Sequence, residues 1–155
     1  MDEREFLLKG WDYELWANRH WLMQLAKFRD QDRARKVMVH IIAPQRFWLD
    51  KINGIDGSFD VYDATPLEDA AFEKVSEEWK ATLNRIDGTT TFDVTRPDGS
   101  QWRFRGFDAA RHVLNHGTYH RGHLRGLAHA EGWDGFEDTD WTRWLRDSGQ
   151  AMRLS

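Results

Sequence analysis

More than half of the chain's seven histidines lie in one short segment. The stretch NHGTYHRGHLRG, Asn115–Gly126, contains His116, His120 and His123, and His112 lies one helical turn earlier. Imidazole is a common metal ligand and a general acid or base near neutral pH, and it also occurs as an ordinary polar surface group. The segment is therefore open to three interpretations: a metal site, acid–base groups, or a polar stripe on a solvated helix.

Helical spacing separates these histidines into two pairs. At about 100° per residue, His120 falls within the apolar arc of the expected helix and His116 about 40° to one side, whereas His112 and His123 lie on its shoulder. The arc is defined by Ala109, Val113, Leu124 and Leu127. The inward pair is four residues apart, so its Cβ atoms lie about 6 Å from each other and one metal ion can bridge both rings. In an arbitrary helix such a pair is more often a surface feature, but among apolar positions a metal would supply the partners that buried imidazoles need.

A third histidine lies on the apolar stripe of an earlier expected helix. His40 is flanked by Val37 and Ile41. Taken alone, it is more simply interpreted as a core histidine with satisfied hydrogen bonds. Opposite a His-x-x-x-His pair, it becomes the natural third ligand of a three-histidine site. His20 and His129 are expected at the surface.

Composition and missing motifs exclude several classes of protein. The chain has no cysteine, which excludes disulfides, thiolate ligands and a cysteine nucleophile, so any metal must be held by nitrogen and oxygen. It contains no phosphate-binding loop, no G-x-S-x-G elbow and no H-E-x-x-H motif, and the histidine-rich helix lacks the Glu-x-x-His motif of di-iron bundles. The net charge of −4, with both signs interspersed, indicates no nucleic-acid partner and no anionic-membrane partner. No apolar run approaches the roughly 20 residues of a membrane span, and the acidic N-terminus does not resemble a signal peptide, so a cytoplasmic protein is expected.

Four segments with helical periodicity would position the histidines. We expect helices over about Asp2–Phe28, over about Gln31–Asn53, after an N-cap at Thr65, and from an N-cap near Asp108 to about Gly132. The inward stripe of the first helix is predicted to be Leu8, Trp11, Leu15, Asn18, Leu22 and Leu25. The stripe of the second is predicted to be Val37, His40, Ile41, Pro44, Trp48 and Ile52, with a kink at Pro44. The third should begin with Pro66 and a capping box from Glu68, and bury Leu67, Ala71, Val75, Trp79 and Leu83.

The connections between these helices differ in character. NGIDGSFDVYDATP is rich in Gly and Asp and predicts a loop. TTTFDVTRPDGSQWRFRGF has strand-like character and predicts a small hairpin, or an extended excursion, with a turn at Asp98–Gly99. EDTDWTRWLRDSG predicts a short C-terminal helix. The whole is an all-α single domain over residues 1–155, an antiparallel four-helix bundle. Nine tryptophans and nine phenylalanines would fill its core, or in part line a pocket or a subunit interface.

The segment HVLNHGTYHRGHLRGLAHAEG resembles the DinB/YfiT-like family of metalloenzymes. VHIIAPQRFWLDKI upstream, DTDWTRWLRD near the end and YELWANRHWLMQLAKF near the start are similar to that family in the expected order, so the resemblance covers essentially the whole chain. Its most specific part is N-H-x-x-x-H-R-G at Asn115–Gly122. Two positions depart from the family pattern. His123 stands where Gln commonly follows H-R-G, and Pro44 stands where an alanine-like residue is expected.

The resemblance implies both a fold and a site. The family's fold is an up-down-down-up four-helix bundle, often a homodimer, and its divalent metal, zinc or nickel in many members, is held by one histidine on the second helix and an H-x-x-x-H pair on the later helix. Carried over residue by residue, these ligands are His40, His116 and His120. His123 could be a group supporting the site, a fourth ligand or a neutral replacement. The other candidates beside the ligands or lining a pocket are His112, Asn115 and Arg121.

The expected function is a metal-dependent enzyme acting on a small-molecule substrate. Three neutral histidines and an open position are typical of catalytic rather than structural zinc sites. The resemblance implies a transferase that activates a low-molecular-weight thiol, such as bacillithiol or mycothiol, toward electrophilic or xenobiotic compounds, and the missing cysteine is compatible with sulfur arriving on a cosubstrate. The alternatives are a metal-dependent hydrolase using a bound hydroxide and a non-catalytic metal-binding stress protein.

Overall fold

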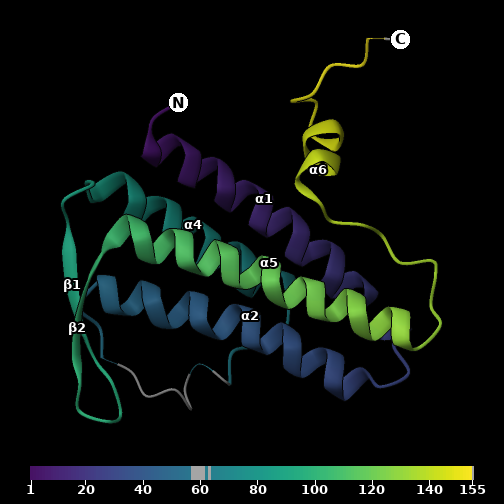
Figure 1. Cartoon of the computed structure of the whole chain (residues 1–155), viewed down its shortest axis with the longest axis horizontal. Helices are drawn as coiled ribbons and strands as arrows, with labels where there is room; N and C mark the ends of the chain where they lie inside the picture. The colour runs from purple at the N-terminus through teal and green to yellow at the C-terminus, as the bar shows by residue number, and fades with distance from the viewer. Residues whose placement is uncertain (57–61, 63, 155) are drawn as a thin grey trace.

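The computed structural model describes residues 1–56, 62 and 64–154, and in it the chain is mostly helical with one small two-stranded sheet. The elements are α1 (Glu3–Gln24), η1 (Leu25–Lys27), α2 (Gln31–Ile52), α4 (Asp69–Arg85), β1 (Thr91–Thr95), β2 (Gln101–Arg105), α5 (Gly106–Ala130) and α6 (Trp141–Asp147). The hairpin lies at one end of the long helices, and α6 lies outside the group of long helices and contacts α1 (Figure 1). None of the helices in the described part of the chain combines the length and the apolar character that crossing a membrane requires.

The four long helices pack side by side. α2 packs against α5 and α1 against α4, with further contacts of α1 with α5 and of α2 with α4. α1 and α5 run in one direction, and α2 and α4 run in the other (Figure 1). Large rings fill the space between them, including Trp11 and Trp79, which stack with their ring centroids 5.1 Å apart. The prediction that the tryptophans help to fill the core is confirmed for these rings.

Local capping explains where the helices begin. Asp2 caps α1 in a capping box with Glu5, Asp30 caps α2, and Asp140 caps α6, so these starts follow from short polar side chains that accept backbone N–H bonds. The predicted extents of the first two helices are confirmed by α1 with η1 and by α2. Pro44 lies inside α2, which is helical on both sides of it.

Two predicted helix starts are wrong. α4 begins at Asp69 rather than after Thr65, because the Thr65 backbone N–H bonds to the carbonyl of Tyr62 in a preceding turn and Glu68 is extended. α5 begins at Gly106, directly after β2, and the Gly106 N–H bonds to the carbonyl of Thr90. The predicted cap Asp108 therefore lies in the first turn, where it pairs with Arg105. Six of the fourteen residues of the predicted Gly- and Asp-rich loop, 57–61 and 63, lie outside the described residues.

The buried faces of α1 and α2 are rotated from the predicted stripes. On α1 the members Leu8, Leu15 and Leu22 are only half-buried, and the fully buried positions include Leu7, Trp11, Glu14, Asn18 and Trp21. On α2 the fully buried positions include Ala34, Met38, Ile41, Ile42, Gln45 and Leu49. His40 is exposed at the edge of this face, so its predicted place in the core is wrong. The rotation of both faces arises because Glu14 and Gln45 are buried although polar, and an apolar pattern does not reveal such positions.

These buried polar side chains join three helices. Arg121 of α5 is 3% exposed and donates to both carboxylate oxygens of Glu14 of α1, at 2.8 and 2.9 Å, and to Asn18 at 2.7 Å. Gln45 of α2 donates to the same carboxylate at 2.8 Å. Gly117 allows this close approach, because a Cβ at that position would overlap the Glu14 carboxylate. The cluster fixes how α5 sits against α1 and α2, which sets the direction of the other face of α5.

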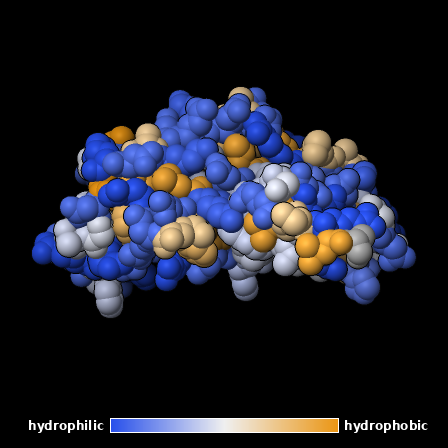
Figure 2. Space-filling view, turned by 90° about the horizontal axis from the view of Figure 1, so that it is seen from above, coloured by the Kyte–Doolittle hydropathy of each residue, from blue (hydrophilic) through white to orange (hydrophobic). Residues whose placement is uncertain are grey.

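The predicted hairpin is confirmed. β1 and β2 are antiparallel, with Phe92 opposite Phe104 and Val94 opposite Trp102, and Gly99 in the turn has φ of +82°. The hairpin packs onto the C-terminal half of α2, where Val94 joins a small buried cluster with Ala43, Phe47 and Tyr62. On the face of the molecule drawn in Figure 2, hydrophilic residues cover most of the surface and apolar groups form small separate patches.

Candidate metal centre

α2 and α5 bring three histidines together. His116 and His120 lie one turn apart on α5, and His40 faces them from α2, the helix that packs against α5. One nitrogen from each ring lies within 4.8 Å of the others. The ring centroids are 4.4 Å apart for His116 and His120, 4.6 Å for His40 and His120, and 5.2 Å for His40 and His116. The three predicted ligands therefore converge from two elements that are far apart in the sequence.

The environment keeps the α5 pair of imidazoles neutral. Burial and, to a smaller extent, the neighbouring His120, His40 and His112 together lower the pKa of His116 to about 4. Burial also lowers the pKa of His120, with smaller effects from His40 and His123. Because a metal binds the neutral imidazole, these shifts favour the ligating form of both rings at neutral pH, and His116 keeps that form well below neutral pH.

One atom of the cluster lacks a partner. Nδ1 of His116 is buried and has no hydrogen-bond partner among the described residues. An unpaired buried polar nitrogen costs free energy, which a cation bound to that nitrogen would offset. Neutral nitrogens at these separations suit a borderline-soft cation such as zinc or nickel, so the residues present fit the divalent metal that the resemblance implies.

The remaining predicted site residues lie in different surroundings. His112 is exposed and packs against the Trp48 ring, with centroids 5.4 Å apart, next to His116 at 5.8 Å. Burial lowers the pKa of His112. His123 and Asn115 are exposed on α5 and do not belong to the three-histidine group.

Arg121 and the two outlying histidines lie outside the cluster. The described contacts of the Arg121 guanidinium are with α1, with Thr118 and with the Tyr13 ring, and none is with a histidine. His129 is exposed, as predicted. His20 is half-buried rather than a surface residue, because its ring packs on Trp16 and shares a 2.8 Å hydrogen bond with the Trp16 carbonyl.

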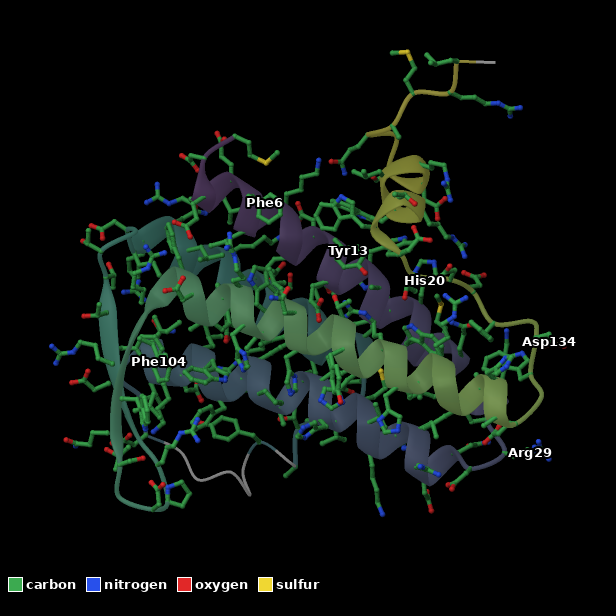
Figure 3. All side chains as sticks on the ribbon, viewed as in Figure 1. Phe6, Tyr13, His20, Arg29, Phe104 and Asp134 are labelled. Atoms are coloured by element: carbon green, nitrogen blue, oxygen red, sulfur yellow. The ribbon has the colours of Figure 1, made fainter. Side chains whose placement is uncertain are left out.

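Two pockets of different character adjoin the three histidines. The first, of about 310 Å³, reaches His116 and His112 and is walled by aromatic and apolar side chains of α2 and the hairpin, including Trp48, Val94 and Phe104. Figure 3 shows Phe104 where the hairpin meets the long helices. The second, of about 610 Å³, reaches His40 and is lined by Asp32, Arg35, Lys36, Val39, Thr65, Pro66 and Leu67. A small molecule could therefore reach His116 through the first pocket and His40 through the second.

Sequence reasoning missed the groups that complete these surroundings. Glu14 was not expected to be buried, and only Asn18, as a polar residue in an apolar stripe, signalled a polar contact inside the helices. The aromatic pocket depends on the hairpin folding back onto α2, which the local sequence pattern does not specify.

His123 provides a direct test of the ligand set. Because it is exposed and lies outside the converging group, we expect His123→Gln to keep nearly full zinc content, measured by elemental analysis of the purified protein. Stoichiometric loss of zinc from this variant would instead make His123 a fourth ligand and the site nearly closed.

The pKa of His116 predicts a pH dependence for the metal-free chain. Its native pKa of about 4 lies below the ordinary value of 6.5, so above pH 6.5 neither folded nor unfolded chain binds a proton at this ring. As pH falls from 6.5 toward 4, only the unfolded chain gains that proton, so the free energy of unfolding falls. Denaturant unfolding should show this decline, and His116→Gln should remove part of it. A histidine NMR titration placing the His116 midpoint near 6.5 would contradict the prediction.

Comparison of the chain with protein-family models, with curated proteins and with solved structures returns no match.

Proposed function

We propose that this chain is a divalent-metal-dependent enzyme whose metal, zinc or nickel, is held by His40, His116 and His120. The observation that carries the proposal is the convergence of their nitrogens within 4.8 Å beside a pocket. Three neutral ligands leave the charge of a cation uncompensated and a coordination position open, as in catalytic rather than structural sites. When bound, the cation would supply a positive charge that favours the anionic form of a thiol or of water near neutral pH.

We further propose that the reaction is transfer to a low-molecular-weight thiol. The chain has no cysteine, so a nucleophilic sulfur must be brought by a cosubstrate. The protein's own contribution would be positioning, because the aromatic pocket at His116 can hold an electrophilic substrate beside the ligands and shield it from water. The resemblance of Asn115–Gly122 to the DinB/YfiT-like family, whose members include thiol transferases, supports this reaction class.

The proposed fold is the up-down-down-up four-helix bundle. Its support is that α1 and α5 run opposite to α2 and α4, and that each long helix contacts at least two of the others (Figure 1). In such bundles metal sites form between side chains of facing helices, as α2 and α5 present them here.

Cobalt substitution tests the thiol proposal. Adding bacillithiol, mycothiol, glutathione or coenzyme A to the cobalt-loaded protein should produce a sulfur-to-metal charge-transfer band in the near ultraviolet for the cognate thiol, with proton release below pH 8. The His116→Ala variant should give no band under the same conditions. If no thiol changes the spectrum at millimolar concentration, thiol activation is wrong, and a hydrolytic screen then decides between a hydrolase and a non-catalytic metal-binding protein.

A further inference from the structure

The pocket between α2, the hairpin and α5 combines aromatic and apolar walls with one arginine, Arg96. Its floor is aromatic, because Trp48 meets Phe104 and His112 edge to face, with ring centroids 5.2 and 5.4 Å away. Val94 and Pro97 add apolar surface from the hairpin. A volume of about 310 Å³ is at the small end of the range for ligand pockets, so its occupant is a small molecule rather than a peptide.

The side chains that line this pocket include one permanent charge. That charge belongs to Arg96, since no Asp, Glu or Lys lines the pocket. Among the described residues, no hydrogen bond or ion pair engages the Arg96 guanidinium. The nearby Asp98 carboxylate accepts hydrogen bonds from the hydroxyl and backbone N–H of Ser100 in the hairpin turn, at 2.7 and 2.9 Å, and interacts with Arg96 only through the longer-range effect of its charge. A ring-sized apolar cavity with a guanidinium at its rim that makes no described hydrogen bond or ion pair suits an aromatic anion.

We propose that this pocket binds the aromatic or similarly flat apolar part of a monoanionic carboxylate, whose carboxylate pairs with Arg96. The role of this ligand rests on the proposed function, because the ligand would be the electrophilic substrate held beside His116. Binding of this ligand does not require the metal, since its ring stacks on Trp48 and Phe104 and its carboxylate pairs with Arg96 of the hairpin. Arg96 is thus a specificity-determining residue, and the hairpin is part of the substrate site.

The test is binding of 2-naphthoate to the full-length chain by isothermal titration calorimetry, with 2-naphthalenemethanol as the neutral analogue and acetate as the carboxylate without a ring. We expect naphthoate to bind more tightly than either. Arg96→Gln should weaken naphthoate binding about tenfold, toward the level of the neutral analogue. Arg103→Gln is the matched control, because Arg103 is exposed on the same hairpin, pairs with Asp93 and does not line the pocket. It should bind naphthoate as the unaltered chain does.

The His40→Ala variant separates this proposal from the metal site. His40 does not line this pocket, so the variant should bind naphthoate normally even though it has lost a proposed metal ligand. Chemical-shift changes of the Val94 methyl groups on adding naphthoate would locate the ligand. The proposal is overturned if naphthoate does not bind, if acetate binds as tightly as naphthoate, or if Arg96→Gln does not weaken naphthoate binding. It is also overturned if Arg103→Gln weakens binding equally, or if His40→Ala abolishes binding, since the carboxylate would then be held by general surface charge or by the metal.

Discussion

His116→Ala is expected to lower the affinity for zinc by more than about 100-fold, because even groups that only support metal ligands contribute 10–100-fold. The His116 ring lies against the rings of His40, His112 and His120, with centroids 5.2, 5.8 and 4.4 Å away. Its loss would leave two imidazoles, which make a weak site. Competition titration with a chromophoric chelator measures the change directly, and His120→Ala and His40→Ala should show losses of the same order.

His129→Ala is the matched control for these substitutions. His129 is exposed near the C-terminal end of the same helix and does not belong to the converging group, so its removal should leave zinc affinity unchanged. Undiminished affinity in His40→Ala would remove α2 from the site and reduce it to a pair on α5. Equal losses in His129→Ala would show that zinc binds the histidines without a specific site.

The second large effect is expected at the buried ion pair between Glu14 and Arg121. Glu14→Ala leaves the guanidinium of Arg121 buried without its carboxylate, which should lower the free energy of unfolding by about 3–5 kcal/mol. Urea denaturation followed by circular dichroism measures this loss. The exposed pair Arg103–Asp93 is the control, and Asp93→Ala should cost less than about 1 kcal/mol.

A double substitution distinguishes charge from packing at this pair. Glu14→Met combined with Arg121→Met removes both charges while keeping apolar volume, so the double variant should be more stable than either single variant. Single variants within 1 kcal/mol of the unaltered chain would contradict the buried-pair account. Such a result would mean that α5 is held against α1 by its apolar contacts alone.

The helices and the metal ligands could be predicted because their signals are local. Asp2 and Asp30 are short polar caps before periodic apolar runs, and they start α1 and α2 where expected. The i, i+4 spacing of His116 and His120 fixes their side-by-side geometry in any helix. His40 could be proposed as their partner from its position on the second expected helix, and the resemblance implied the same ligand; in the structure it lies opposite them.

The failures arise where tertiary contacts override local patterns. On α1 the predicted stripe, with Leu8, Leu15 and Leu22, is more apolar than the face that is buried in the structure. The buried face includes Glu14, whose burial depends on Arg121 more than 100 residues away. Thr65 had the sequence of an N-cap, but its backbone is used by a turn with Tyr62. The aromatic pocket was not predicted, because it exists only where the hairpin packs back onto α2.

X-ray absorption spectroscopy of the zinc-loaded chain tests the metal site most directly. The account predicts uptake of one equivalent of zinc per chain and a shell of nitrogen and oxygen at about 2.0–2.1 Å. It also predicts the outer-shell scattering of three imidazoles, from His40, His116 and His120, which should fall by one imidazole in any variant that still binds zinc after losing one of them. Failure to take up stoichiometric zinc or nickel, or a bound zinc with no more than one imidazole in its shell, would contradict the account.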